Sequence, residues 1–233
     1  MSVKKEFSRF AHKYRQYNQI QTKVAQHLVD FLDKKDYNTL MDIGCGRGAV
    51  YEALTHKGIE FENFYAVDFS AQMLELHPNH KVKKVCANFN TLEFTQQLKD
   101  IRCDTLLSSS ALQWSSDLHF SLSQISSLSN KFCFAIFTDN TFKTLHTQAG
   151  ITSPIHSSSK LLQEIRSVFT IEQSEIVNYI LHFAKKRDIF DYIKKSGVSG
   201  GERRLDFRST KRLMETYELD YLEFEVLFVK CVV

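Results

Sequence analysis

Short apolar runs alternate with segments whose apolar residues recur at helical spacing, from about residue 20 to the end of the chain. This alternation predicts a parallel β-sheet with helices packed on it, an α/β fold. The run at 132–137 is apolar throughout, which predicts a central strand. The predicted strands are 40–43, 61–67, 82–86, 104–107, 132–137, 171–181 and 221–233.

Helices are predicted between these strands. Ser70 and Asp117 stand just before helical patterns and are predicted to cap them, because their side chains can accept from free backbone N–H groups. Gly58 is a predicted C-cap. The predicted helices are 20–32, the segment after the first strand up to about 57, a short one after Ser70, then 117–128, 161–165, 183–193 and one from about 210; aromatic residues in 7–18 also recur at helical spacing.

The pattern changes in the last third of the chain. Two long strands flank a helical excursion, which we expect to form a small cap. A chain of 233 residues fits a single domain. We expect one domain over 1–233, with a helical segment at 1–35, a cofactor-binding core at 35–150, and a C-terminal half at 151–233 whose cap lies near 182–216.

The most informative segment is a glycine-dense turn after the first strand. It contains Gly44, Gly46 and Gly48, and helical spacing follows it. Glycine permits positive φ and lets a ligand approach the backbone. About twenty residues further on, the second strand ends in Asp68, where nucleotide-binding α/β folds hold a ribose diol. Three interpretations of this turn are open at this point: a dinucleotide site, a site for another nucleoside cofactor, and a chance glycine turn.

Composition narrows the class of protein. Hydrophobic residues make up 43% of the chain, as in an ordinary globular core. There is no apolar run of about 20 residues, and no apolar stretch follows the first basic residues, so we expect a cytoplasmic protein without a secretory signal. The five cysteines are widely spaced with no C-x-x-C pair, which predicts reduced thiols and no zinc site or other metal.

The net charge of +3 is unevenly distributed. Residues 182–212 hold ten basic and four acidic residues, a balance of +6, and residues 1–35 hold eight basic and three acidic residues, a balance of +5. Such asymmetry indicates either an acidic partner or two solvated helix faces.

The segment from Asp42 to Gly48 reads D-x-G-x-G-x-G, which resembles the first motif of class I S-adenosylmethionine-dependent methyltransferases. That resemblance implies a Rossmann-like sheet with an antiparallel terminal strand and S-adenosylmethionine as cofactor. Asp68 would bind the ribose, Phe69 and Met73 would pack against the adenine, and Asn88 would accept from the adenine amine in place of the usual aspartate. The implied cofactor-binding residues are Tyr14, Asp42, Gly44, Cys45, Gly46, Asp68, Phe69, Met73, Asn88, Phe89, Ser108 and Ser109.

Three further blocks resemble a narrower family, the malonyl-acyl-carrier-protein O-methyltransferases of biotin synthesis. They are Phe7-Ser8-Arg9-Phe10-Ala11-x-x-Tyr14, the run from Ser108 to Trp114, and Ile193-Lys194-Lys195-Ser196-Gly197-Val198. The resemblance covers nearly the whole chain. It departs from the family at Asn88, at Ser109, where asparagine is common, and in the loop after Val198.

This family resemblance implies methyl transfer to the free carboxylate of a malonyl group on acyl carrier protein, an acidic partner. A carboxyl group with a pKa of about 4 is ionised at neutral pH, so no catalytic residue acting by acid–base chemistry is expected. Alignment and desolvation would carry the reaction. The expected substrate-binding residues are Tyr17, Gln113, Trp114, Arg203 and Arg204, and the two arginines are candidates to hold the carboxylate.

Three other functions stay open. A small-molecule carboxyl methyltransferase of the aconitate type also carries a Gln-Trp block and needs no carrier protein. A non-catalytic S-adenosylmethionine-binding protein is disfavoured by the intact glycine motif and Asp68. Nucleic-acid methylation is permitted by the basic stretch, but no Asn-Pro-Pro-aromatic motif follows the fourth strand. No membrane and no nucleic-acid partner are expected.

Overall fold

The computed structural model describes residues 18–196 and 207–233. Seven strands form one sheet in the order β3-β2-β1-β4-β5-β7-β6. Every neighbouring pair is parallel except those that β7 makes with β5 and β6, which are antiparallel. The strands are β1 (Asp36–Ile43), β2 (Glu60–Asp68), β3 (Val82–Cys86), β4 (Thr105–Ser109), β5 (Lys131–Phe137), β6 (Thr170–His182) and β7 (Tyr221–Val232).

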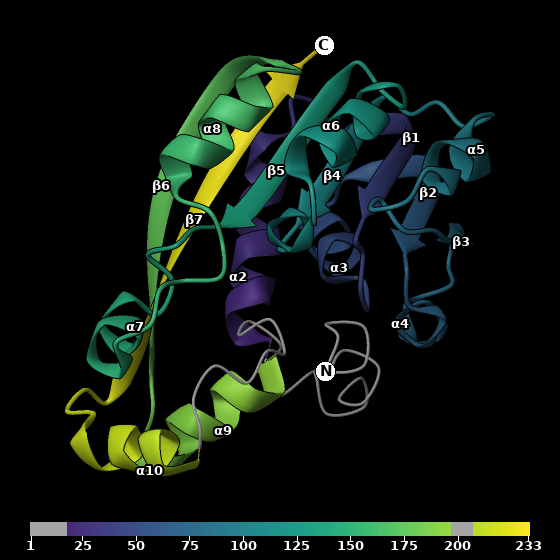
Figure 1. Ribbon diagram of the computed structural model, residues 1–233. Helices are drawn as coiled ribbons and strands as arrows, with labels where there is room; N and C mark the ends of the chain where they lie inside the picture. Colours follow the sequence, from purple (N-terminus) through teal and green to yellow (C-terminus); the bar gives the residue numbers. More distant parts are fainter. Residues whose placement is uncertain (1–17, 197–206) are drawn as a thin grey trace.

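Helices cover both faces of the sheet (Figure 1). On one face, α2 (Gln19–Leu28) and α3 (Ala49–His56) pack with α4 (Ala71–Leu76) into one hydrophobic core. On the other face, α5 (Glu93–Leu98), α6 (Leu118–Ser126) and α8 (Ser158–Arg166) form a second core. The sheet is therefore the middle layer of three. The remaining helices are α7 (Lys143–Ala149), α9 (Lys186–Ser196) and α10 (Phe207–Thr216), with 3-10 turns η2 (Val29–Phe31) and η3 (Leu112–Trp114).

The seven predicted strands are all present, and the class I α/β fold is confirmed. The predicted caps are also present: the Ser70 hydroxyl accepts from the N–H of Met73, and the Asp117 carboxylate accepts from that of Phe120. The helix predicted over 183–193 begins later, at Lys186, because the hairpin still pairs at Phe183, whose N–H donates to the Asp220 carbonyl. Helices α5 and α7 were not predicted.

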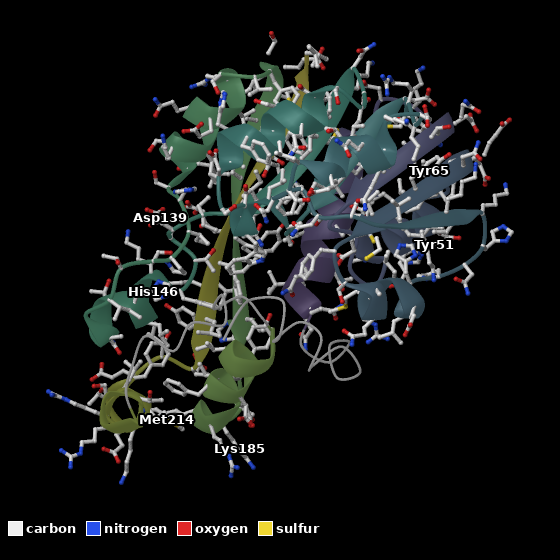
Figure 2. All side chains as sticks on the ribbon, turned by 45° about the vertical axis from the view of Figure 1, so that its right-hand side comes forward. Tyr51, Tyr65, Asp139, His146, Lys185 and Met214 are labelled. Carbon is white, nitrogen blue, oxygen red and sulfur yellow. The ribbon has the colours of Figure 1, made fainter. Side chains whose placement is uncertain are left out.

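The β6–β7 hairpin extends past the rest of the sheet and carries α9 and α10, which we call the cap (Figure 1). Lys185 and Met214 lie in this region, far from Tyr65 on β2 (Figure 2). Ile189 of α9 and Leu213 of α10 are buried in the same core as α2 and α3. The cap is therefore packed onto the domain. Within the described residues, no helix is long and apolar enough to cross a membrane.

Candidate functional site

A cavity of about 400 Å³ lies where β1, β2 and β4 end, beside the glycine turn. Because these strands are parallel, their carboxyl ends meet at one edge of the sheet, which is where ligands bind in open α/β folds. Among the predicted residues that the structure describes, most line this cavity. They are Asp42, Gly44, Cys45, Gly46, Asp68, Phe69, Met73, Asn88, Phe89, Ser109 and Trp114.

The three glycines of the turn all have positive φ, at 71°, 52° and 95° for Gly44, Gly46 and Gly48. At Gly44, a Cβ would stand 2.2 Å from the Cβ of Ala111, so this glycine is required by packing against the chain that follows β4. A Cβ on Gly46 would meet nothing within 4 Å, so only its backbone conformation favours glycine. Gly44 is therefore required by tertiary packing as well as by its φ, and Gly46 is favoured by its φ alone.

Asp68 ties the end of β2 to the glycine turn. One carboxylate oxygen accepts from the N–H of Gly46 at 2.9 Å and the other from the N–H of Ser70 at 2.8 Å. Burial raises the pKa of Asp68, and these two N–H donors counteract that effect. Asp68 thus lines the cavity with a carboxylate whose position is fixed from two sides.

Asp42, near the end of β1, has a different environment. It is 1% exposed, and neither of its carboxylate oxygens has a hydrogen-bond partner. Burial, and then the nearby charge of Asp68, raise its pKa well above the ordinary value. A buried carboxylate without a partner is costly, so this end of the cavity favours a cationic group of a ligand.

Cys45 lies in the glycine turn, between Gly44 and Gly46. Burial and the charges of Asp42 and Asp68 raise the pKa of its thiol well above the usual range. The thiol is therefore protonated at neutral pH and unsuited to act as a nucleophile. Its side chain serves as part of the cavity lining.

Apolar side chains line the cavity beyond the ends of β2 and β3. Phe69 follows β2, Met73 lies on α4, and Phe89 follows β3. Asn88 also lines the cavity, and its side-chain oxygen accepts from the N–H of Asn90 at 3.0 Å. That oxygen shapes a turn and still has a second lone pair for a ligand. The geometry of Asn88 therefore fits a turn residue as well as an acceptor for the adenine amine.

The structure does not place the side chain of Ser108, a predicted cofactor-binding residue, at the cavity. Its side chain is completely buried, its hydroxyl donates to the Ile43 carbonyl at 2.8 Å, and it does not line the cavity. Alternation along β4 is the reason, since successive side chains point to opposite faces of the strand. Ser108 fastens β4 to β1, and the next residue, Ser109, lines the cavity.

The prediction of direct substrate contact by Gln113 is also not supported, while Trp114 lines the cavity. The Gln113 side chain is 9% exposed, and its Nε2 donates to the Ser110 carbonyl at 2.7 Å. Four predicted residues, Tyr14, Tyr17, Arg203 and Arg204, lie outside the described residues.

Several cavity residues were missed from the sequence. Asn18 and Gln21 come from α2, and the Gln21 side-chain oxygen is buried without a partner. Ser110 follows β4 with a positive φ of 58°. The signal for Gln21 was its place on the apolar side of an amphipathic helix. Other lining residues that were not predicted are Arg47, Ala49, Val50, Glu52, Leu76, Pro78, Ala87, Asn90 and Ala111. In 18–196 and 207–233, no three His, Cys, Asp or Glu side chains gather as metal ligands would.

Comparison with known proteins agrees with this geometry. A family model described as a methyltransferase domain matches residues 41–130, which include the glycine turn, Asp68 and the serines at the end of β4. The YcgJ protein from Bacillus subtilis superposes with a TM-score of 0.61 at 13% identity, over 90% of this chain and 97% of that one. At such low identity the superposition shows the shared fold.

Relatives are similar over nearly the full length. The malonyl-[acyl-carrier protein] O-methyltransferase of Bacillus cytotoxicus is 26% identical over 94% of this chain and 84% of its own. The protein of the same name from Bacillus anthracis is 24% identical over 94% of this chain and 89% of its own. The chain is an S-adenosylmethionine-dependent methyltransferase of the class I fold, and over most of its length it resembles the malonyl-[acyl-carrier protein] O-methyltransferases.

Proposed function

We propose that this enzyme methylates the free carboxylate of a malonyl group carried by acyl carrier protein, an early step of biotin synthesis. The observation that carries the proposal is a cavity with two buried carboxylates beside the glycine turn, in a chain whose full-length relatives bear that name. The small-molecule acid methyltransferase is the alternative that the test below must exclude.

The cavity residues fit S-adenosylmethionine group by group. Asp68 would accept from the ribose hydroxyls, because its carboxylate lies at the end of β2 and has lone pairs beyond those used by Gly46 and Ser70. Asp42 would pair with the ammonium group of the methionine part, which supplies the partner that its two oxygens lack. The apolar side chains after β2 and β3 would enclose the adenine ring.

The cofactor supplies a methyl group activated on a positively charged sulfonium. The protein need not remove a proton, because the acceptor carboxylate is already ionised at neutral pH. Among the described residues that line the cavity there is no histidine, and the thiol of Cys45 stays protonated. The contribution of these residues is to align the reacting oxygen and to exclude water from it.

The partner part of the proposal rests on charge. The strand β6 runs parallel to β1, so the cap follows its carboxyl end, at the edge of the sheet where the cavity lies. Exposed basic residues flank and occupy the cap: Lys185, Lys186, Arg187, Arg208, Lys211 and Arg212. An acidic carrier protein would be attracted to such a surface.

The function is tested with cofactor labelled on its methyl group. We expect transfer to malonyl-carrier protein, with slower transfer to malonyl-coenzyme A and none to aconitate. Mild base should hydrolyse the product ester and release its labelled methyl group as methanol. Efficient transfer to aconitate together with no transfer to either malonyl thioester would contradict the proposal and favour the small-molecule alternative.

A further inference from the structure

Ser110 has an unusual backbone conformation at the edge of the cavity. Its φ is 58°, in the left-handed region that serine rarely adopts. The described chain has two other non-glycine residues with positive φ, Lys81 and Phe142, and neither lines the cavity. Strained backbone persists where neighbouring contacts hold it, and it concentrates at ligand sites.

Two hydrogen bonds hold Ser110 in this conformation. Its N–H donates to the Ala135 carbonyl of β5 at 2.8 Å, and its carbonyl accepts from Gln113 Nε2 at 2.7 Å. The next residue, Ala111, packs so closely on the glycine turn that Gly44 has no room for a Cβ. Gln113 therefore closes a short loop that fixes the position of Ser110 beside the cofactor turn.

Two side chains in this loop have unused hydrogen-bonding capacity. Ser109 and Ser110 both line the cavity, and each hydroxyl oxygen is shielded from solvent without a partner. Buried polar groups are usually paired, so an unpaired hydroxyl in a cavity wall is the expected partner of a ligand. A serine hydroxyl can donate as well as accept, and it turns about one bond to meet a ligand.

The position of these serines separates them from the nucleoside end of the cavity. The sheet order places β1 between β2 and β4. Asp68 ends β2, and Phe69 and Asn88 follow β2 and β3. Ser109 ends β4 and Ser110 follows it, on the other side of the glycine turn. A nucleoside held at the β2 side leaves the β4 side for the acceptor.

We propose that Ser110 donates a hydrogen bond to the acceptor carboxylate, and that Gln113 is the positioning residue that holds Ser110 in its left-handed conformation. This rests on the proposed function in needing a carboxylate acceptor. A neutral hydroxyl suits this task, because it donates one charge-assisted hydrogen bond to a carboxylate oxygen and so orients the group. Ser109 is the adjacent second donor.

The test compares Ser110→Gly with the parent enzyme. Glycine adopts the same φ without strain, so the backbone is kept while the hydroxyl is lost. We expect the KM for malonyl-carrier protein to rise about tenfold, as for a lost hydrogen bond to a charged group, with the thermal midpoint unchanged or higher. The Kd for S-adenosylhomocysteine, measured by calorimetry, should stay within about twofold, since no cofactor contact is lost. Ser115→Gly is the matched control, because that hydroxyl pairs with Ser121 and Ser115 does not line the cavity.

Gln113 is tested by coupling. Gln113→Leu should raise the same KM, and the double variant with Ser110→Gly should be no worse than the more impaired single variant, because both remove one interaction. Additive losses would overturn the positioning role, and a fall in S-adenosylhomocysteine affinity in Ser110→Gly would assign the hydroxyl to the cofactor instead. If the parent methylates another carboxylic acid, the proposed function fails and the KM shift is measured on that acid. An acceptor without a carboxylate would overturn the Ser110 proposal as well.

Discussion

The carboxylate of Asp68 accepts a 2.9 Å hydrogen bond from the backbone N–H of Gly46, which lies 22 residues earlier in the chain. This bond joins the end of β2 to the turn that follows β1. It makes one side chain responsible both for the shape of the glycine turn and for a lone pair that a ribose can use. A substitution at Asp68 would therefore affect the turn and the ligand contact together.

We predict that Asp68→Ala weakens S-adenosylhomocysteine binding by more than about tenfold, because hydrogen bonds to charged groups contribute about 1.5–3 kcal/mol each. Calorimetric titration measures the effect. Glu62→Ala, which removes an exposed carboxylate from the same strand, is the control and should leave the Kd unchanged. An unaltered Kd in Asp68→Ala would remove this residue from the site.

At Asn88 we predict that Asn88→Asp keeps or improves cofactor affinity and that Asn88→Leu weakens it about three- to tenfold, since only an acceptor oxygen is needed for the adenine amine. Leucine also loses the bond to the Asn90 N–H, so the ligand must be varied as well. S-inosylhomocysteine has a carbonyl in place of the amine. The leucine variant should lose affinity for the adenosyl ligand alone; an equal loss for both ligands would indicate a turn residue.

For Asp42 we predict opposite effects on stability and on binding. Burial raises the pKa of this carboxyl, so the folded state binds a proton that the unfolded state releases above pH 4 or so. The free energy of unfolding of the parent should therefore fall relative to Asp42→Asn as pH rises from 5 to 8. Thermal unfolding at several pH values measures this difference.

The same Asp42→Asn variant should bind S-adenosylhomocysteine less tightly, because the amide cannot pair with the ligand's ammonium group as a carboxylate does. 5′-Methylthioadenosine lacks that ammonium and should bind the parent and the variant alike. If the variant lost stability at pH 8, or weakened both ligands equally, Asp42 would be a structural residue only.

We predict that charge reversal on the cap impairs the carrier protein specifically. Arg208→Glu with Lys211→Glu should raise the KM for malonyl-carrier protein while leaving turnover of malonyl-coenzyme A nearly unchanged, because exposed charges act mainly on association. The effect should shrink at high salt, where the Debye length falls below about 8 Å. Lys194 and Lys195 belong to the same basic stretch, residues 182–212, and we expect them to contribute as well.

Lys34→Glu with Lys35→Glu is the matched control, since these exposed lysines precede β1 and lie at the opposite edge of the sheet from the cavity. Equal damage to both substrates by the cap variant would mean that it perturbs the fold or the cavity. If the cap variant impaired the methylation of neither substrate, the carrier protein would bind elsewhere. The basic stretch would then be only a solvated helix face.

The local pattern was sufficient to predict the seven strands, the caps at Ser70 and Asp117, and the meeting of the glycine turn with Asp68. These features depend on side-chain alternation, on capping hydrogen bonds and on the rule that parallel strands end at one edge, all of which are written in short stretches of chain. The helices α5 and α7 were missed because they are short, with few apolar positions to reveal a period.

Only the tertiary structure decided which of several adjacent residues face the cavity. Ser108 and Ser109 look equivalent in the sequence, yet Ser108 donates to β1 and Ser109 lines the cavity. The reason is that successive side chains of a strand point to opposite faces of the sheet. The requirement for glycine at Gly44 comes from Ala111, and the conformation of Ser110 comes from Gln113 and Ala135. Such contacts join residues from different elements, so no local pattern records them, and they set the shape of the site only once the sheet is assembled.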